Sequence, residues 1–419
     1  MEYFRKTISV FFEYDTPKIV HIKSKRIGIT NRLLQILIVS YIIGYAIVWK
    51  KGYQETCPVT SAVTTKVKGV VYTNLTRQQL GVGNYSPLYE RIWDPTDYTI
   101  PTSGGEYGGF FITTNVIITP NQTRGKCPED FKIEGAICND DADCPSGQSL
   151  PIGNGIFTGK CVEAPRAINK TCEILAWCPV ELDEPPLHGK RALLEGAKNF
   201  TVLIKNVIEF PKFGAKYKRR NILENSNVTY LQRCIYHAEN DPFCPVFRIG
   251  DIVAAAGENF SEVAVKGSVF EIEITWDCDL DWNFMEYCRP KYSFERMDSP
   301  EALISPGWNF RTAEYHEENR RTLFKNYGIK FLVKVSGQAG KFYLVPLLIN
   351  LGSGLALLGL ATIFCDILVL RCMKNRRYYQ DKKYLVIRAP DAFDVLPEDC
   401  ERNQRDSNDI EGSSGTCAR

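Results

Sequence analysis

Two long apolar segments interrupt an otherwise mixed pattern of hydrophobic and polar residues, one near each end of the chain. The first covers about residues 33–49, and the second covers about residues 342–370. At a rise of about 1.5 Å per residue, each is long enough to cross the roughly 30 Å hydrocarbon core of a bilayer as a helix. The pattern therefore predicts two transmembrane helices, with both chain ends on one side of the membrane and residues 50–341 as one large domain on the other.

Charge indicates which side is which. Seven Lys or Arg residues precede the first apolar segment, and six follow the second within residues 371–383. Basic residues collect on the cytosolic side of membrane proteins, so we expect cytosolic termini, residues 1–32 and 371–419. Because about thirty residues, several of them charged, precede the first segment, it reads as a signal anchor rather than a cleaved signal peptide. The expected location is the plasma membrane, with an intracellular acidic compartment as the alternative.

The middle domain has the composition of an extracellular protein. All seven Asn-x-Ser/Thr sequons lie in it, as do eleven of the 15 cysteines. The sequon at Asn84 is followed by Pro87, which disfavours its use. We therefore expect glycosylation at Asn74, Asn121, Asn169, Asn199, Asn227 and Asn259.

The spacing of the cysteines predicts disulfides rather than a metal site. Cys234 with Cys244 and Cys278 with Cys288 are expected to form local bridges. Six more cysteines cluster in residues 127–178, where spacing alone leaves many connectivities open. Zinc ligation is not indicated, because there is no CxxC pair and the four histidines are scattered. Cys57 is left over, either as an accessible thiol, an intermolecular bridge or a buried apolar residue.

Alternating β-branched and aromatic residues predict a mainly β domain. The expected strands are residues 64–72, 110–119, 201–207, 263–276 and 328–335, with a short helix at 254–262. The polar, acid-rich tail after about residue 390 is expected to be disordered. The predicted fold class is thus a membrane protein with two transmembrane α-helices flanking a large, mainly β, disulfide-rich extracellular domain, whose cysteine-rich subregion is residues 115–178.

Basic residues recur with a period of two on the predicted strands. Lys66 and Lys68 should project from one face of a strand, and Asn309 and Arg311 from one face of another. Lys325 precedes the strand that leads to the second apolar segment. Such residues usually form a solvated face, and nothing local shows that these segments meet. The alternative is a cationic site for an anionic ligand.

Several ordered motifs give the chain a specific resemblance. They are KVKG at residues 66–69, NFTVLIKN at 199–206, FRIGD at 247–251, WDCDLD at 276–281, NFR at 309–311 and GQAGKF at 337–342, with TPK at 16–18 and YQDKK at 379–383. In their order, spacing and ten accompanying cysteines, from about residue 10 to 385, the chain resembles the ionotropic purinergic receptors, the ATP-gated trimeric cation channels.

The resemblance implies an ATP site between adjacent subunits. Lys66, Lys68, Asn309, Arg311 and Lys325 would hold the phosphates, Thr201 would hydrogen-bond to adenine, and Leu203 would pack against the base or sugar. ATP would be an agonist, with no cofactor, metal or catalytic residue. Consistent with this, there is no GxxxxGK[ST] loop, and His188, His237 and His316 have no clear nucleophile partner. The implied bridges are Cys127–Cys178, Cys138–Cys161, Cys144–Cys172, Cys234–Cys244 and Cys278–Cys288.

The second apolar segment would line the pore. The resemblance places a constriction near Ile349, Asn350 and Ser353, and Ser353 stands where a small apolar residue is more usual. A pore needs more than two helices, so a homotrimer or heterotrimer is implied, with the lipid bilayer, Na⁺, K⁺ and Ca²⁺ as partners and no nucleic acid. The alternatives are an acid-sensing or epithelial sodium channel-like trimer, and a membrane-anchored adhesion or ecto-enzyme protein.

Overall fold

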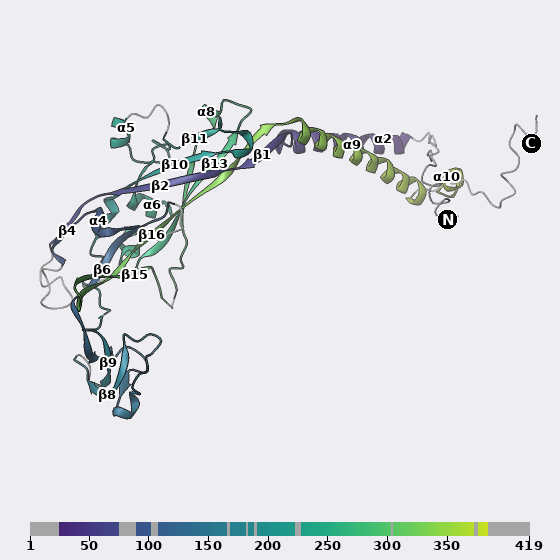
Figure 1. Cartoon of the computed structure of the whole chain (residues 1–419). Helices are drawn as coiled ribbons and strands as arrows, with labels where there is room; N and C mark the ends of the chain where they lie inside the picture. The colour runs from purple at the N-terminus through teal and green to yellow at the C-terminus, as the bar shows by residue number, and fades with distance from the viewer. Residues whose placement is uncertain are drawn as a thin grey trace, which may run out of the picture. The chain divides into compact units, whose positions relative to one another are not determined.

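The computed structural model of the chain describes residues 25–74, 89–101, 108–165, 168–181, 183–187, 191–222, 228–302, 305–372 and 376–383. Its contacts divide the chain into two units, Glu55–Phe342 and the paired terminal segments Met1–Gln54 and Tyr343–Arg419 (Figure 1). The expected disordered tail, the TPK motif, His188 and the sequons at Asn84 and Asn227 lie outside the described residues.

The larger unit is built on a ten-stranded sheet with the central order β14-β13-β16-β6-β9-β7. β13 runs parallel to β16, and β6 runs antiparallel to it. Alternate residues of β13, from Phe270 to Trp276, are buried, which is the period-two pattern of a strand with one face on a core. The six strands in this order have the bounds β6 (Phe110–Pro128), β7 (Ile137–Cys138), β9 (Lys170–Cys178), β13 (Ser268–Asp279), β14 (Lys291–Arg296) and β16 (Arg320–Phe342). β1 (Gln54–Pro58), β5 (Thr99–Pro101), β8 (Ile156–Glu163) and β15 (Asn309–Glu317) pair alongside them.

A second, four-stranded sheet packs against the same hydrophobic core. It contains β2 (Thr60–Lys68), β10 (Thr201–Glu209), β11 (Lys218–Arg220) and β12 (Val246–Arg248). β10 lies between β2 on one edge and β11 and β12 on the other. β3 (Val71–Thr73) and β4 (Arg91–Trp93) form a small ribbon. The described part of this unit also contains the short helices α4 (Pro95–Tyr98), α5 (Val228–Arg233), α6 (Ile249–Ala255), α7 (Phe260–Lys266) and α8 (Phe284–Tyr287).

Two sequence-based boundaries are wrong in the segment between α6 and β13. The single helix expected at 254–262 is instead α6 and α7, separated by Gly257 at φ +81° and by Asn259, whose side chain accepts a hydrogen bond from the Ser261 N–H at 3.0 Å. The strand expected to start at 263 starts at Ser268, because 260–266 is helical. Gly267 ends α7 at φ +80°, where an added Cβ would lie 2.3 Å from the Gly328 carbonyl.

The cysteine-rich region is a small sheet with its own core. β9 pairs with β7, β8 and the distal end of β6. Three of the five buried residues at its centre are cysteines, namely Cys138, Cys144 and Cys172, and the other two are Phe157 and Ile174. Cross-links thus replace much of the apolar core that so small a region cannot build. Five disulfides join cysteines of the described residues, namely Cys127–Cys178, Cys138–Cys161, Cys144–Cys172, Cys234–Cys244 and Cys278–Cys288, which are the pairs that the resemblance implied.

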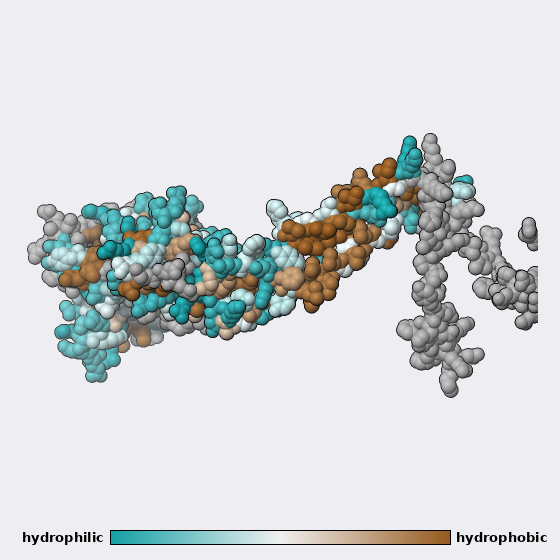
Figure 2. Space-filling view, turned by 90° about the horizontal axis from the view of Figure 1, so that it is seen from above, coloured by the Kyte–Doolittle hydropathy of each residue, from teal (hydrophilic) through white to brown (hydrophobic). Residues whose placement is uncertain are grey.

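The described part of the smaller unit contains two long apolar helices and a short one. The first is α2 (Lys25–Ser40) continuing as the π-helical η1 (Tyr41–Trp49), and the second is α9 (Leu344–Ile367) continuing as η5 (Leu368–Cys372). Both are long and apolar enough to cross a membrane. Helix α10 (Arg376–Lys383) follows. Figure 2 shows hydrophobic residues gathered over the long helices and mostly hydrophilic ones over the sheets. The first helix is longer than the apolar segment, because polar residues from Lys25 to Arg32 are also helical.

Candidate functional site

The register of β2 against β10 brings four predicted site residues together. Lys68 lies opposite Thr201, and Lys66 lies opposite Leu203. Opposed residues of an antiparallel pair project from the same face, so two ammonium groups and the Thr201 and Leu203 side chains share one surface. Lys66 and Lys68 are exposed, whereas Thr201 and Leu203 are half-buried. We call this the β2/β10 face.

The packing of β10 against the core makes the β2/β10 face point away from the core. Val202 and Ile204 are fully buried, so the residues that alternate with them point away from the core. At the end of β2, Gly69 has φ +153°, and an added Cβ would lie 2.2 Å from the Phe200 ring. Tyr98 stacks on that ring at 4.3 Å and donates its hydroxyl to the Gly69 carbonyl at 2.9 Å. Only glycine permits this close approach of the two strand ends.

Two further residues extend the β2/β10 face, and sequence reasoning missed both. On β12, Arg248 lies opposite Thr201, and Val246 lies opposite Leu203. Arg248 adds a third cation beside Thr201, and its Nε lies 3.8 Å from Asp251. The alternation of Val246, buried Phe247 and Arg248 was the available signal, since it predicts that the first and third residues share an outer face.

The other predicted site residues meet on β15 and β16. Arg311 lies opposite Lys325, and Asn309 lies opposite Tyr327. These four residues therefore project from one face of the large sheet. We call this the β15/β16 face.

Two carboxylates that the sequence did not single out neutralise the β15/β16 face. The Arg311 Nε and Nη2 donate to the two oxygens of Glu181 at 2.6 and 3.1 Å, a bidentate pair. The Lys325 Nζ lies 2.6 Å from a carboxylate oxygen of Asp183 and 3.6 Å from one of Glu181. Asp183 also accepts a hydrogen bond from the Tyr327 hydroxyl at 3.0 Å. The Lys325 side chain is only 6% exposed. The signal in the sequence was the acidic pair directly after the last cysteine of the cysteine-rich region.

These contacts favour the charged forms of Arg311, Asp183 and Lys325. The hydrogen bond that Arg311 donates to Glu181 raises the pKa of Arg311 above its ordinary value despite partial burial. Burial alone would raise the pKa of Asp183, but the Lys325 ammonium outweighs it and the pKa lies below its ordinary value. Burial alone would likewise lower the pKa of Lys325, but Asp183 and Tyr327 outweigh it and the pKa is raised. The face is therefore a stable ion-pair network at neutral pH.

The two faces are on different sheets. Among the described residues, no hydrogen bond or ion pair connects Lys66 or Lys68 with Arg311 or Lys325. Each face holds part of the predicted ligand set: the β2/β10 face has two lysines with the Thr201 and Leu203 side chains, and the β15/β16 face has Asn309, Arg311 and Lys325.

The predicted pore residues point in different directions from α9. The Asn350 Nδ2 donates to the Gly52 carbonyl at 2.6 Å and to Pro346 at 3.0 Å, so its amide faces the end of the first long helix. Gly354 lies on the same side, where an added Cβ would be 2.9 Å from Ile42. Ile349 is 62% exposed, and Ser353, one turn further on, is also exposed and donates to the Ile349 carbonyl at 2.6 Å.

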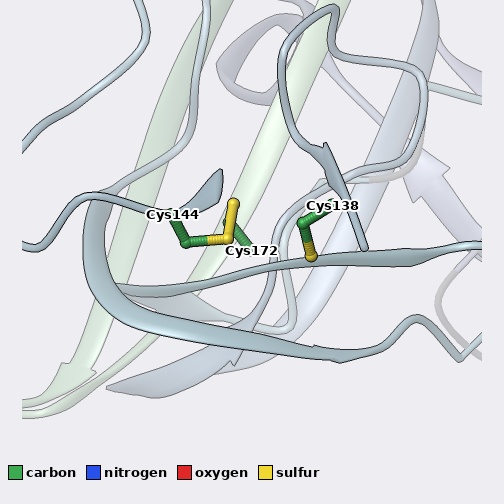
Figure 3. A group of neighbouring side chains, drawn as sticks. All are labelled: Cys138, Cys144 and Cys172. Carbon is green, nitrogen blue, oxygen red and sulfur yellow. A yellow bond between two sulfur atoms is a disulfide. The ribbon is translucent and has the colours of Figure 1, made fainter. Parts of the chain in front are cut away.

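The acidic and sulfur-containing clusters of the described residues do not form metal sites. Cys138, Cys144 and Cys172 lie close together, but their sulfur atoms are in bridges; Figure 3 draws the bond between Cys144 and Cys172. In the other cluster, Cys234 and Cys244 are also bonded to each other. A disulfide sulfur is not the thiolate that a metal requires.

Cys57 is the remaining cysteine of the larger unit. Its side chain is 5% exposed and belongs to the main core. The prediction of an accessible thiol is therefore wrong, and Cys57 is a buried residue that packs as a small apolar side chain.

The sequon asparagines of the described residues lie at the surface. Asn74, Asn121, Asn169, Asn199 and Asn259 are all exposed. Exposure is the geometric requirement for a glycan, so glycosylation at these positions stays a prediction that the surface allows.

Three comparisons agree on one family. Residues 12–386 match the family model described as ATP P2X receptor. Mouse P2X purinoceptor 4 is 50% identical over 90% of this chain and 94% of its own, and mouse P2X purinoceptor 5 is 41% identical over 96% and 88%. A crystal structure of an invertebrate P2X receptor from the Gulf Coast tick, in the presence of ATP and Zn²⁺, is 48% identical with a TM-score of 0.76, covering 81% of this chain and 100% of that one. A crystal structure of the chicken ATP-gated P2X7 receptor channel, in the presence of the competitive antagonist TNP-ATP, is 40% identical with a TM-score of 0.68. The match covers 81% of this chain and 98% of that one.

Proposed function

Because this chain belongs to the P2X receptor family, we propose that it is one subunit of a trimeric cation channel of the plasma membrane that extracellular ATP opens. Both termini are cytosolic, and the protein is not an enzyme. The alternatives considered from the sequence, an acid-sensing or epithelial sodium channel-like trimer and an adhesion or ecto-enzyme protein, are not favoured by the comparisons.

We place the ATP site between neighbouring subunits. ATP carries close to four negative charges, and charge-assisted hydrogen bonds contribute about 1.5–3 kcal/mol each. In our proposal the β2/β10 face of one subunit supplies Lys66, Lys68, Thr201 and Leu203, and the β15/β16 face of its neighbour supplies Asn309, Arg311 and Lys325. The separation of these residues into two faces on different sheets supports a shared site. Arg248 and Val246 extend the first face beside Thr201 and Leu203.

The ion pairs of the β15/β16 face suggest how binding leads to opening. Phosphate oxygens would replace Glu181 on Arg311, which forms the same bidentate geometry with phosphate as with carboxylate. That exchange changes the partners of β15 and β16. β16 ends at Phe342, and the pore helix α9 begins two residues later, at Leu344. A change at Lys325 can therefore reach the pore along one strand.

The observation that carries the proposal is the register that puts Lys66 beside Leu203 and Lys68 beside Thr201. It is tested by recording ATP-evoked current in cells that lack native purinergic receptors. Expression should give an inward cation current on ATP application and none on extracellular acidification alone. A current evoked by acid but not by ATP would favour the sodium channel alternative, and no evoked current from protein at the cell surface would favour the adhesion alternative.

We expect Glu181→Gln to increase ATP sensitivity. The substitution removes the carboxylate that competes with phosphate for Arg311 while keeping the side-chain shape. Arg311 is about half exposed, so the pair contributes on the order of 1 kcal/mol, and the ATP concentration–response curve should shift left by about fivefold. The matched control is Glu163→Gln, an exposed carboxylate on β8, which should leave the curve in place. An unchanged or right-shifted curve for Glu181→Gln would contradict the competition between carboxylate and phosphate.

We expect Ser353→Val to reduce current in the absence of ATP. A hydroxyl in an apolar constriction lowers the cost of wetting it, and such constrictions close by losing water. The Ser353 hydrogen is occupied by the Ile349 carbonyl, so its oxygen would be the group that faces water. Whole-cell recording without agonist should show a smaller leak in Ser353→Val and Ser353→Ala, with the ATP concentration–response curve unchanged. Equal leak in parent and variants would remove Ser353 from the gate.

A further inference from the structure

A cavity of about 340 Å³ lies where the cysteine-rich sheet joins the main sheet. One part of its wall is the segment of β6 that contains Ile117 and Ile118, and another is Pro179–Val180, directly after β9. Phe131, from the loop after β6, is also part of the lining. Most of the lining is apolar, and the volume is that of a pocket for a small organic molecule.

The charged residues of the lining are all acidic. Of its sixteen residues, all of them described, Glu129, Asp130 and Glu184 are charged and none is basic. Glu129 is 2% exposed and accepts hydrogen bonds from three neutral N–H groups, those of the Asn154 backbone at 2.7 Å, the Asn154 side chain at 2.6 Å and the Asp130 backbone at 3.0 Å. These three donors are neutral. Of the other two carboxylates, Glu184 lies 3.8 Å from the Lys132 ammonium at the surface, whereas no ion pair between described residues involves Glu129 or Asp130. An apolar wall with these two carboxylates is complementary to a lipophilic cation and repels an anion such as ATP.

The cavity is in direct contact with the segments that hold the β15/β16 face. Ile117 is the register partner of Lys325. Val180 directly precedes Glu181, the bidentate partner of Arg311. The Gln122 Nε2 of β6 donates to the Pro179 carbonyl at 2.8 Å and ties these two parts of the wall together. A molecule that fills the cavity therefore restrains the residue that follows Val180.

We propose that this cavity binds an amphiphilic organic cation, an apolar ring system carrying an amine, and that its occupant keeps Glu181 paired with Arg311. Binding itself does not depend on the function proposed above. The effect on gating rests on that function, and its direction follows: an occupied cavity opposes the exchange of Glu181 for phosphate, so it lowers ATP sensitivity without competing for the ATP-binding residues.

The test compares diphenylpropylamine with the neutral diphenylpropanol of the same shape. Saturation-transfer NMR on the purified full-length protein without ATP should show binding of the amine and weaker binding of the alcohol. In the Asp130→Asn variant, amine binding should weaken about fivefold or more and alcohol binding should stay unchanged. Ala164→Trp, which adds a ring to the lining, should abolish binding of both compounds. In cells, the amine should shift the ATP curve of the parent to the right and leave that of Ala164→Trp in place.

Controls separate the possible failures. Glu134→Gln, an exposed carboxylate outside the lining, should bind the amine as the parent does. Surface expression and ATP-evoked current without amine establish that each variant is folded. Amine binding that persists in Ala164→Trp, or equal binding of amine and alcohol, would overturn the site. Binding in a protein that ATP does not open would instead refute the proposed function and leave the cavity site standing.

Discussion

Lys68→Ala and Arg311→Ala should each shift the ATP concentration–response curve to the right by about tenfold or more. Each side chain is expected to make at least one charge-assisted hydrogen bond to a phosphate, and about 1.4 kcal/mol corresponds to a factor of ten. Lys68 is the cleaner test, because it is exposed and its removal leaves the surrounding sheet intact. Arg311→Ala also removes the bidentate partner of Glu181, so Arg311→Lys is the companion variant that keeps a cation without the fork.

The comparison requires a lysine whose loss should be silent. Lys216 is exposed in the loop before β11, and Lys216→Ala removes the same charge away from both faces. Currents are measured over a range of ATP concentrations, with surface labelling to show equal expression. If Lys68→Ala and Arg311→Ala respond to ATP as Lys216→Ala does, neither residue holds a phosphate.

Removing the Cys144–Cys172 bridge should destabilise the cysteine-rich sheet by about 3 kcal/mol. The bridge joins residues 28 apart. A cross-link that closes a loop of this length lowers the conformational entropy of the unfolded chain, which stabilises the folded state by about that amount. Both sulfur atoms also belong to the small core, which contains only two other fully buried side chains besides Cys138. The variant is Cys144→Ser/Cys172→Ser, and the measurement is hydrogen exchange across residues 137–175.

The expected result is faster exchange within β8 and β9 and unchanged exchange in β13 and β16, because the main core does not contain these cysteines. Cys234→Ser/Cys244→Ser provides the control, since that bridge joins residues only ten apart in another part of the domain. Native exchange rates in β8 and β9 after loss of Cys144–Cys172 would show that the other two bridges suffice.

Local patterns allowed much of the site to be predicted, but its assembly depends on register. The period of two correctly predicts that Lys66 and Lys68 share a face, as they do on β2. Their position beside Thr201 and Leu203 follows from pairing with a strand more than 130 residues away, which no local pattern encodes. The carboxylate of Glu181 was missed for the same reason, because its partner Arg311 lies 130 residues further along.

In the segment of helix α7, the sequence contained signals for a helix, but β-strand propensity was given more weight. Val263 and Val265 favoured a strand by propensity. However, Asn259 and Gly267 frame the segment as N-cap and C-terminal stop, and Phe260, Val263 and Ala264 have helical spacing and are buried. Capping residues and periodicity were better guides here than β-branching, because burial against β16 and β6 sets which residues must face inward.

The 23-residue strand β16 has a mechanical consequence. Lys325 lies near its beginning and Phe342 ends it, a span of 17 residues or about 55 Å at roughly 3.3 Å per residue. From Lys325 to Gly340 its Cα partners on β13 or β6 hold it in register. At Gly337 the neighbouring Trp276 backbone is so close that only a residue without Cβ fits. A paired strand of this kind resists stretching, so a displacement at one end is transmitted to the other rather than absorbed by the chain. Inserting a single residue after Lys325 would turn every later side chain, including the buried Phe331 and Ala339, to the opposite face of the sheet, so the length of this strand is fixed by the core as well as by the two ends that it joins.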